Sequence, residues 1–185
     1  MKYTRIVLFV FFVSRIFLVN AQESEKTSSI VPIDEETQLI TFQEVIEEEG
    51  SSKEELFNRC INWLNNYYAN PVAVTKIRDF ASGKIEGRHQ FRITYEEEGY
   101  EQNAGMILYT FVIEFKDGRY RYTLSDFLLR QASRYPIEKW LDKSDPAYND
   151  QWNSYLRQVR EFTKEWKATL EESMQPEPEV VEEEW

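Results

Sequence analysis

The 185-residue sequence contains a single cysteine, Cys60, and a single histidine, His89. One cysteine cannot form an intramolecular disulfide, so core packing alone must stabilise the folded chain. A zinc site would need several carboxylates beside these two residues, and neither the H-E-x-x-H spacing nor a calcium-loop spacing is present. Both residues fall on positions that face the predicted core. We therefore predict no metal site, no catalytic Cys-His pair and no catalytic residues.

Glycine is also scarce, with six residues in the chain. Gly83 and Gly87 lack the spacing of either phosphate-binding glycine motif, so no nucleotide cofactor is expected. Basic residues are outnumbered 33 to 22 by acidic ones, which leaves a formal net charge of −11 at pH 7. A chain this acidic repels a phosphate backbone, and a nucleic-acid partner is disfavoured.

The N-terminus has the pattern of a secretory signal peptide over residues 1–21. Lys2 and Arg5 precede an unbroken apolar run at residues 6–13, and Ala21 ends the segment at a suitable cleavage position. The run is too short to span a membrane, which takes about 20 apolar residues. We expect cleavage after Ala21 and export to the periplasm, the cell surface or the medium. An uncleaved anchor is the alternative.

The rest of the chain divides into three parts. Residues 22–37 are polar and aperiodic, which predicts a flexible leader. Residues 38–174 alternate between strand and helix patterns and form one predicted domain, since 42% hydrophobic and 15% aromatic residues suffice for a core. Residues 175–185 are rich in glutamate and proline, which predicts a disordered acidic tail.

Two helices are expected in the domain. Ser52 and Glu55 have the spacing of a capping box, and Asn70-Pro71 ends the helix that follows. Asp145-Pro146 is expected to start the second helix, which runs through Glu172. Each helix carries an apolar stripe: Leu56, Cys60, Trp63 and Tyr67 in the first, and Trp152, Tyr155, Leu156, Val159, Phe162, Trp166 and Leu170 in the second.

Strand alternation predicts a first strand near residues 38–46, then strands within residues 72–79, 84–95, 107–115 and 119–127. Residues 96–103 are expected to be an acidic loop, and Asp117-Gly118 a two-residue type I′ hairpin turn. The predicted order is β-α-β-β-β-β-α. Because most connections are hairpins, we expect an α+β domain with one mostly antiparallel sheet and both helices on a single face.

Four arginines share the solvent-facing parity of two predicted strands: Arg88, Arg92, Arg119 and Arg121. They form the candidate binding site, a local basic platform for an anionic glycan, a lipid head group or an acidic peptide. Cross-strand pairing with Glu86 and Glu114 is the competing explanation, since such pairs are an ordinary way to keep an open sheet face soluble.

Several stretches share a further pattern: residues 52–63, 83–87, 109–121, 135–138 and the last helix up to Met174. Together they resemble a known family of exported Bacteroidota proteins, catalogued as domain of unknown function 4468. The resemblance covers about residues 38–174 and implies a curved sheet similar to that of the TATA-box-binding protein. It supplies no activity and no functional residues, and DNA binding cannot be inferred from a fold.

The sequence alone names no specific activity. The interpretation it favours is a non-enzymatic exported envelope protein that binds an envelope protein, a glycan or an anionic ligand. The alternative is a carboxylate-dependent hydrolase of envelope or extracellular glycans. A concave site with convergent carboxylates would favour the hydrolase.

Overall fold

The computed structural model describes residues 29–176. Its elements follow the order β1 (Phe42–Glu47), α1 (Lys53–Tyr67), α2 (Pro71–Val74), β2 (Thr75–Asp79), β3 (Lys84–Glu97), β4 (Tyr100–Lys116), β5 (Arg119–Leu129), β6 (Tyr135–Pro136), the 3₁₀ helix η1 (Ile137–Leu141) and α3 (Gln151–Met174). The predicted signal peptide at 1–21 lies outside the described residues, as do positions 22–28 and 177–185. Among the described helices, none is both long and apolar enough to cross a membrane.

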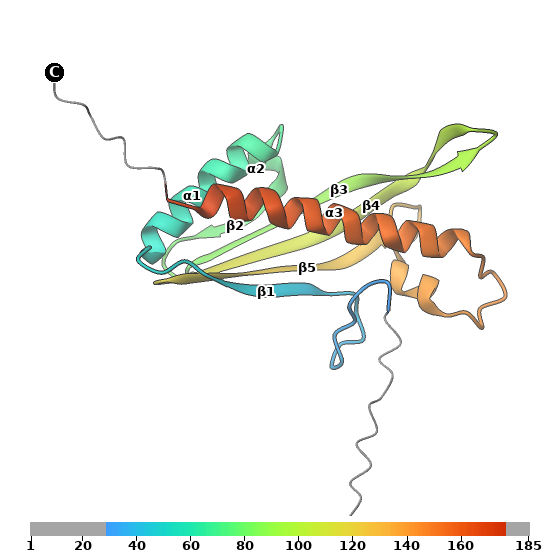
Figure 1. Ribbon diagram of the computed structural model, residues 1–185, viewed down its shortest axis with the longest axis horizontal. Coiled ribbons are helices and arrows are strands. Elements are labelled where there is room, and N and C mark those ends of the chain that lie inside the picture. Colours follow the sequence, from blue (N-terminus) through green and yellow to red (C-terminus); the bar gives the residue numbers. More distant parts are fainter. Residues whose placement is uncertain (1–28, 177–185) are drawn as a thin grey trace, which may run out of the picture.

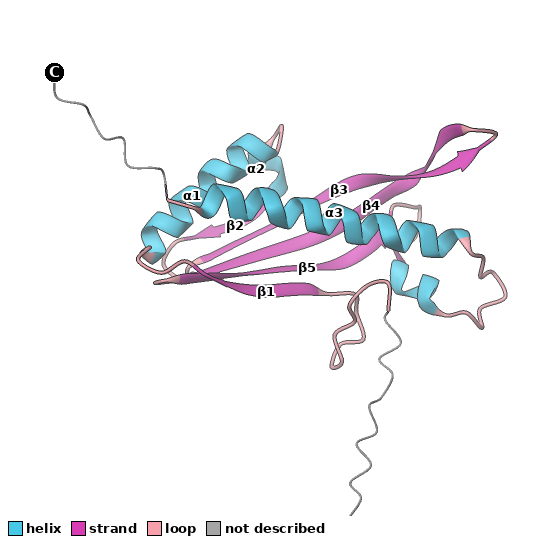
Figure 2. Cartoon of the chain, in the orientation of Figure 1, coloured by secondary structure: helices cyan, strands magenta, loops and turns pink. Residues whose placement is uncertain are grey.

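The six strands form one antiparallel sheet in the order β1-β5-β4-β3-β2, with β6 paired to β5. Figures 1 and 2 show α1 and α3 lying together over one face of this sheet. The predicted α+β class, antiparallel sheet and single helical face are confirmed. The sequence reading missed β6, the short helix α2 and η1.

Alternation along β4 positions the core. Ile107, Tyr109, Phe111, Ile113 and Phe115 are all buried beneath the helices, while the residues between them point to the other face. α3 covers them with the predicted apolar stripe, of which Leu156, Val159, Trp166 and Leu170 are fully buried. Successive side chains of a strand point to opposite faces of the sheet, and the apolar stripe of a helix packs against one of these faces. One face of the sheet is therefore buried and the other stays free.

A short chain of hydrogen bonds lies inside this core. The indole Nε1 of Trp166 donates to the hydroxyl of Tyr68 at 2.9 Å, and the hydroxyls of Tyr68 and Tyr109 are hydrogen-bonded at 3.1 Å. Burial raises the pKa of both tyrosines, so both stay protonated. These hydrogen bonds connect the end of α1, the centre of α3 and the middle of β4.

The start of α1 is fastened to the β4–β5 hairpin. The predicted capping box is present, with the Ser52 hydroxyl accepting from the Glu55 N–H and the Glu55 carboxylate accepting from the Ser52 N–H. Asp117 accepts from the backbone N–H of Lys53 at 2.8 Å. Of the two turn residues only Gly118 has a positive φ, so the hairpin is confirmed but its predicted type I′ geometry is wrong.

Three further expectations differ from the structure. The predicted leader extends too far, because Val31 is fully buried and Ile33 bridges Ile40. Residues 96–103 are no loop: β3 and β4 pair to their ends, and Glu98 and Gly99 form the tight turn with positive φ angles. The second long helix begins at Gln151 rather than near Asp145, whose carboxylate caps a turn at the N–H of Ala147 instead.

The predicted strand at 72–79 also begins later than expected. Asn70 caps the one-turn helix α2 by accepting from the Ala73 N–H, and β2 starts only at Thr75. β2 pairs with β3 only as far as Gly87. A side chain at Gly87 would meet the Phe111 ring at 2.2 Å and the Val74 carbonyl oxygen at 2.8 Å, so glycine permits this close approach.

Candidate binding surface

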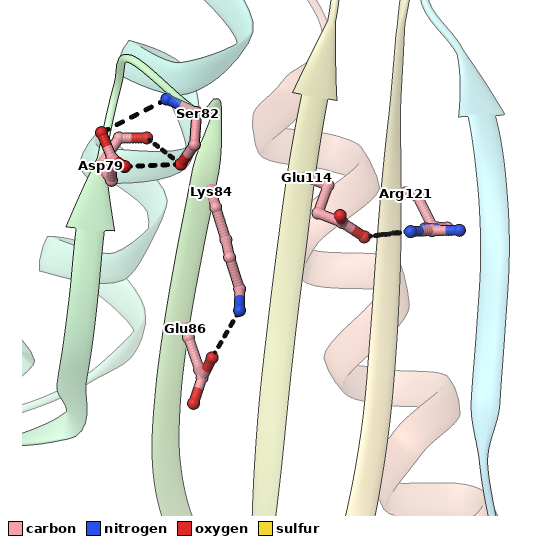
Figure 3. A network of polar contacts seen from close by, with 6 residues as sticks. All are labelled: Asp79, Ser82, Lys84, Glu86, Glu114 and Arg121. Carbon is pink, nitrogen blue, oxygen red and sulfur yellow. Dashed lines mark hydrogen bonds and ion pairs between the residues drawn. The ribbon is translucent and has the colours of Figure 1, made fainter.

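The face of the sheet opposite α1 and α3 is the candidate surface. Its centre is the outward half of β4, where Met106, Leu108 and Val112 are half-buried. At the β1 edge, Val45 exposes 49% of its surface. Figure 3 looks onto this face with the helices behind it. The surface thus has an apolar centre, and charged side chains of the neighbouring strands surround it.

The four predicted arginines all lie on this face and are exposed, but they do not form one platform. β4 separates β3 from β5. Through the β4 register, Arg88 is aligned with Thr110, Arg92 with Met106 and Arg121 with Glu114. With about 3.3 Å per residue and about 4.8 Å per strand, Arg88 lies about 16 Å and Arg92 about 28 Å from Arg121.

Arg119 and Arg121 form the first group, together with Lys116, which the sequence analysis missed. These cations and Val45 line a depression of about 330 Å³ at the β4–β5 hairpin end of the sheet. Arg121 Nε donates to Glu114 Oε2 at 2.9 Å, while Arg119 lies 3.9 Å from Glu47. Lys116 could have been found from its parity, since it shares the alternation of Glu114 on the same strand.

The competing explanation of the arginines, pairing with Glu86 and Glu114, is correct for Arg121, while Arg119 has a different cross-strand carboxylate beside it, Glu47. Arg121 does pair with Glu114, as Figure 3 shows. Glu86 pairs with Lys84 at 2.7 Å rather than with an arginine. Within residues 29–176, no carboxylate lies in ion-pair distance of Arg88 or Arg92.

Arg88 and Arg92 form the second group, along the part of β3 that extends beyond β2. A hollow of about 410 Å³ lies there, lined by Ala69, Asn70, Ala73, Val74, Lys76, Arg88, His89, Gln90 and Leu108. The sequence analysis missed Lys76 as a neighbour of this group, since nothing in its local pattern indicates where α2 sits beside β3.

The cysteine is buried in the structure, whereas the histidine is exposed. Cys60 is fully buried in α1, as predicted, and burial raises the pKa of its thiol. His89 is on the predicted face of β3 but is exposed, because it lies at the uncovered edge beside the end of α1. The predicted helix-side direction of His89 is therefore correct, but its expected burial in the core is wrong. Partial burial against Tyr68 still lowers the pKa of its imidazole.

Carboxylates come together at the far end of the β3–β4 arm. Glu96 and Glu101 are direct cross-strand neighbours and line a depression of about 470 Å³ with Gln151 and Ser154 of α3. Both glutamates are exposed. In the described part of the chain, no group of three or more histidine, cysteine, aspartate and glutamate side chains is placed to hold a metal ion.

Solved structures share this architecture. A TBP-like protein from Parabacteroides distasonis has a TM-score of 0.64 at 16% identity, with 79% of this chain and 97% of that chain covered. A DUF4468 family protein from Bacteroides ovatus has a TM-score of 0.65 at 15% identity, with 83% and 94% covered. At these identities the likeness shows the fold, which is the TBP-like α+β fold.

The family follows from the sequence of the sheet region. Residues 42–129 match the family described as a domain of unknown function (DUF4468) with TBP-like fold. This match confirms, over residues 42–129, the resemblance seen in the sequence. No functionally curated protein matches the chain.

Proposed function

We propose that this protein is a non-enzymatic binding module of the cell envelope that docks an acidic surface of another exported protein. The observation that carries the proposal is the open sheet face at the β4–β5 hairpin end, where exposed Val45 lies among Lys116, Arg119 and Arg121. Together with the half-buried Met106, Leu108 and Val112 at the centre of this face, they give an apolar centre with a charged rim, which is the composition of a protein–protein interface. The cations in a chain with net charge −11 select an acidic partner.

The predicted export signal indicates the compartment in which the partner is expected. If residues 1–21 direct export, the mature chain meets envelope proteins rather than cytoplasmic ones. Intact mass of the exported protein tests this step: we expect a chain that starts at Gln22, and a mature form that retains Met1 would contradict export by cleavage.

Crosslinking and affinity capture from the native envelope test the binding proposal. The test variant is Arg119→Gln with Arg121→Gln, and the matched control is Arg157→Gln with Lys164→Gln, two exposed cations on the outer side of α3. Both variants remove two positive charges. The proposal expects the test variant to lose a partner that the wild type and the control retain.

Stability separates binding from simple charge pairing. The Arg121–Glu114 pair is exposed and contributes at most about 1 kcal/mol, so the test variant should melt only slightly below the wild type. A lowered melting temperature with every captured partner retained would refute the proposal, because the arginines would then serve only to solubilise the sheet.

A hydrolase could use Glu96 and Glu101, the carboxylates that the β3–β4 register places side by side. Glycoside hydrolysis needs an acid and a second carboxylate in different environments, flanking a bound sugar. These two glutamates are both exposed on a two-stranded arm, so their surroundings do little to distinguish them. The binding module is therefore the better-supported function.

A further inference from the structure

One stretch of β3 has a free edge. β2 pairs with β3 only over Lys84–Gly87, whereas β3 and β4 remain paired from Lys84 to Glu97. Further along, the edge is closed at Thr94, whose N–H donates to Gln158 Oε1 at 2.9 Å and whose carbonyl accepts from Gln158 Nε2 at 2.8 Å. Among residues 29–176, nothing pairs with the outer backbone of residues 88–93 between these two points. Figure 1 shows β3 continuing past the end of β2.

The direction of the free groups follows from Thr94. In an antiparallel strand the N–H and C=O of one residue point to the same side, and every second residue repeats that direction. The β3–β4 register shifts between Ile93 and Thr94, but the extra residue there, Ala104, belongs to β4, so the alternation along β3 is uninterrupted from Arg88 to Thr94. The backbone groups of Arg88, Gln90 and Arg92 therefore point outward, as those of Thr94 do. They form a template for about six residues of an added strand, roughly 20 Å long.

The space beside this template has the place and lining that an added strand needs. The hollow of about 410 Å³ lies between residues 88–90 of β3 and the end of α2, which directly precedes β2. On the helix side it is lined by Ala69, Ala73 and Val74, which suit small apolar side chains. On the open side it is lined by Arg88 and Gln90. A strand seated there would present apolar and acidic residues in alternation.

From these observations we infer that β3 binds an extended acidic segment of a partner protein by β-strand addition along residues 88–93. Charge selects this occupant over a second copy of the chain. Antiparallel pairing of two β3 edges centred on Gln90 would place Arg88 of each copy opposite Arg92 of the other, and like charges directly opposite one another destabilise a sheet. Glutamates at those positions instead pair with two arginines that have no carboxylate partner within the described residues.

A single proline tests the backbone contact. Gln90→Pro removes an outward N–H while leaving the β4 side of the strand intact, since proline is tolerated at an edge where its nitrogen faces solvent. Gln90→Thr is the matched control, because it loses the same side-chain contact with Arg130 but keeps the N–H. The probe is a short fluorescent peptide of alternating glutamate and valine, with binding measured by anisotropy on the full mature chain.

We expect the probe to bind Gln90→Thr and wild type with similar affinity and Gln90→Pro about tenfold more weakly, the effect of one lost hydrogen bond of about 1.4 kcal/mol. N-methylation of alternate peptide amides should also abolish binding. Arg88→Gln with Arg92→Gln should weaken binding and flatten its salt dependence, whereas Arg119→Gln with Arg121→Gln should leave it unchanged. That contrast keeps this site separate from the proposed docking face.

Hydrogen exchange on the wild type does not depend on how any variant folds. Saturating peptide should slow exchange of the Gln90 and Arg92 amides and leave the amide of Thr94 unchanged. Equal affinity of the proline and threonine variants, or unchanged exchange at both amides, would overturn the inference. Dimerisation of the free chain through the same edge in analytical ultracentrifugation would overturn it too, since the occupant would then be a second copy.

Discussion

Replacing Tyr68 by phenylalanine should destabilise the protein more than the same change at Tyr109, although each removes one hydroxyl group. Both tyrosines and Trp166 are at most 4% exposed. The Tyr68 hydroxyl is hydrogen-bonded to both the Trp166 N–H and the Tyr109 hydroxyl, whereas within residues 29–176 the Tyr109 hydroxyl is hydrogen-bonded only to that of Tyr68. Tyr68→Phe thus leaves two buried polar groups unpaired and Tyr109→Phe at most one.

The magnitudes follow from the price of a buried group without a partner, about 1–3 kcal/mol each. Tyr68→Phe should lower the free energy of unfolding by at least about 2 kcal/mol, and Tyr109→Phe by about 1 kcal/mol. The double variant should cost less than the sum of the two, because it no longer contains the stranded Tyr109 hydroxyl. Neighbours that share a partner commonly show couplings of about 0.5–3 kcal/mol.

Urea unfolding of the three variants and the wild type, followed by circular dichroism, measures these differences. If the free energy of unfolding falls equally steeply with urea concentration in all four proteins, the variants differ in stability alone. If Tyr109→Phe proved as costly as Tyr68→Phe, or if the two effects were strictly additive, the hydrogen-bond chain would not be the unit that stabilises this part of the core.

Three further predictions concern the cap, the thiol and alkaline pH. Ser52→Ala removes the cap of α1 and should lower the free energy of unfolding in urea by about 1 kcal/mol. An unchanged free energy of unfolding would show that the cap does not stabilise the helix. Cys60 should react with a bulky thiol reagent only as fast as the protein unfolds, and rapid labelling of the native protein would contradict its burial. Burial raises the pKa of Tyr68 and Tyr109 above their ordinary value of 10.0, so the unfolded chain loses these protons first as pH rises. The two tyrosines therefore contribute their full share to the free energy of unfolding below pH 10. Above pH 10 the free energy of unfolding should fall by about 1.4 kcal/mol per pH unit for each tyrosine, and a value that does not change with pH would refute their burial.

Much of the fold could be predicted because its signals are local. The capping box at Ser52 and Glu55 depends on residues three positions apart, and the alternation from Ile107 to Phe115 depends on nearest neighbours along one strand. Both patterns are properties of the chain itself, and both are confirmed. The side of the sheet to which Arg88 and Arg121 belong follows from the same alternation.

The misreadings have physical reasons of their own. Glutamate at three successive positions, 96–98, is typical of a loop, but the pairing of β3 with β4 extends through this run to the Glu98-Gly99 turn. The β-branched residues after Pro71 suit a strand, yet Asn70 caps them into a helical turn. His89 has the parity of a core residue, and only the place where α1 ends leaves it exposed.

The sequence by itself determined the class of fold, the capped start of α1, the buried face of β4 and the outward parity of the arginines, since each depends on residues close together in the chain. Only the tertiary structure decided which of these residues meet. The strand order inserts β4 between the two pairs of arginines, so that Arg119 and Arg121 join Val45 and Lys116 on one surface while Arg88 and Arg92 flank the free edge of β3. Strand order and the point at which β2 stops depend on contacts between distant segments, which no local pattern contains.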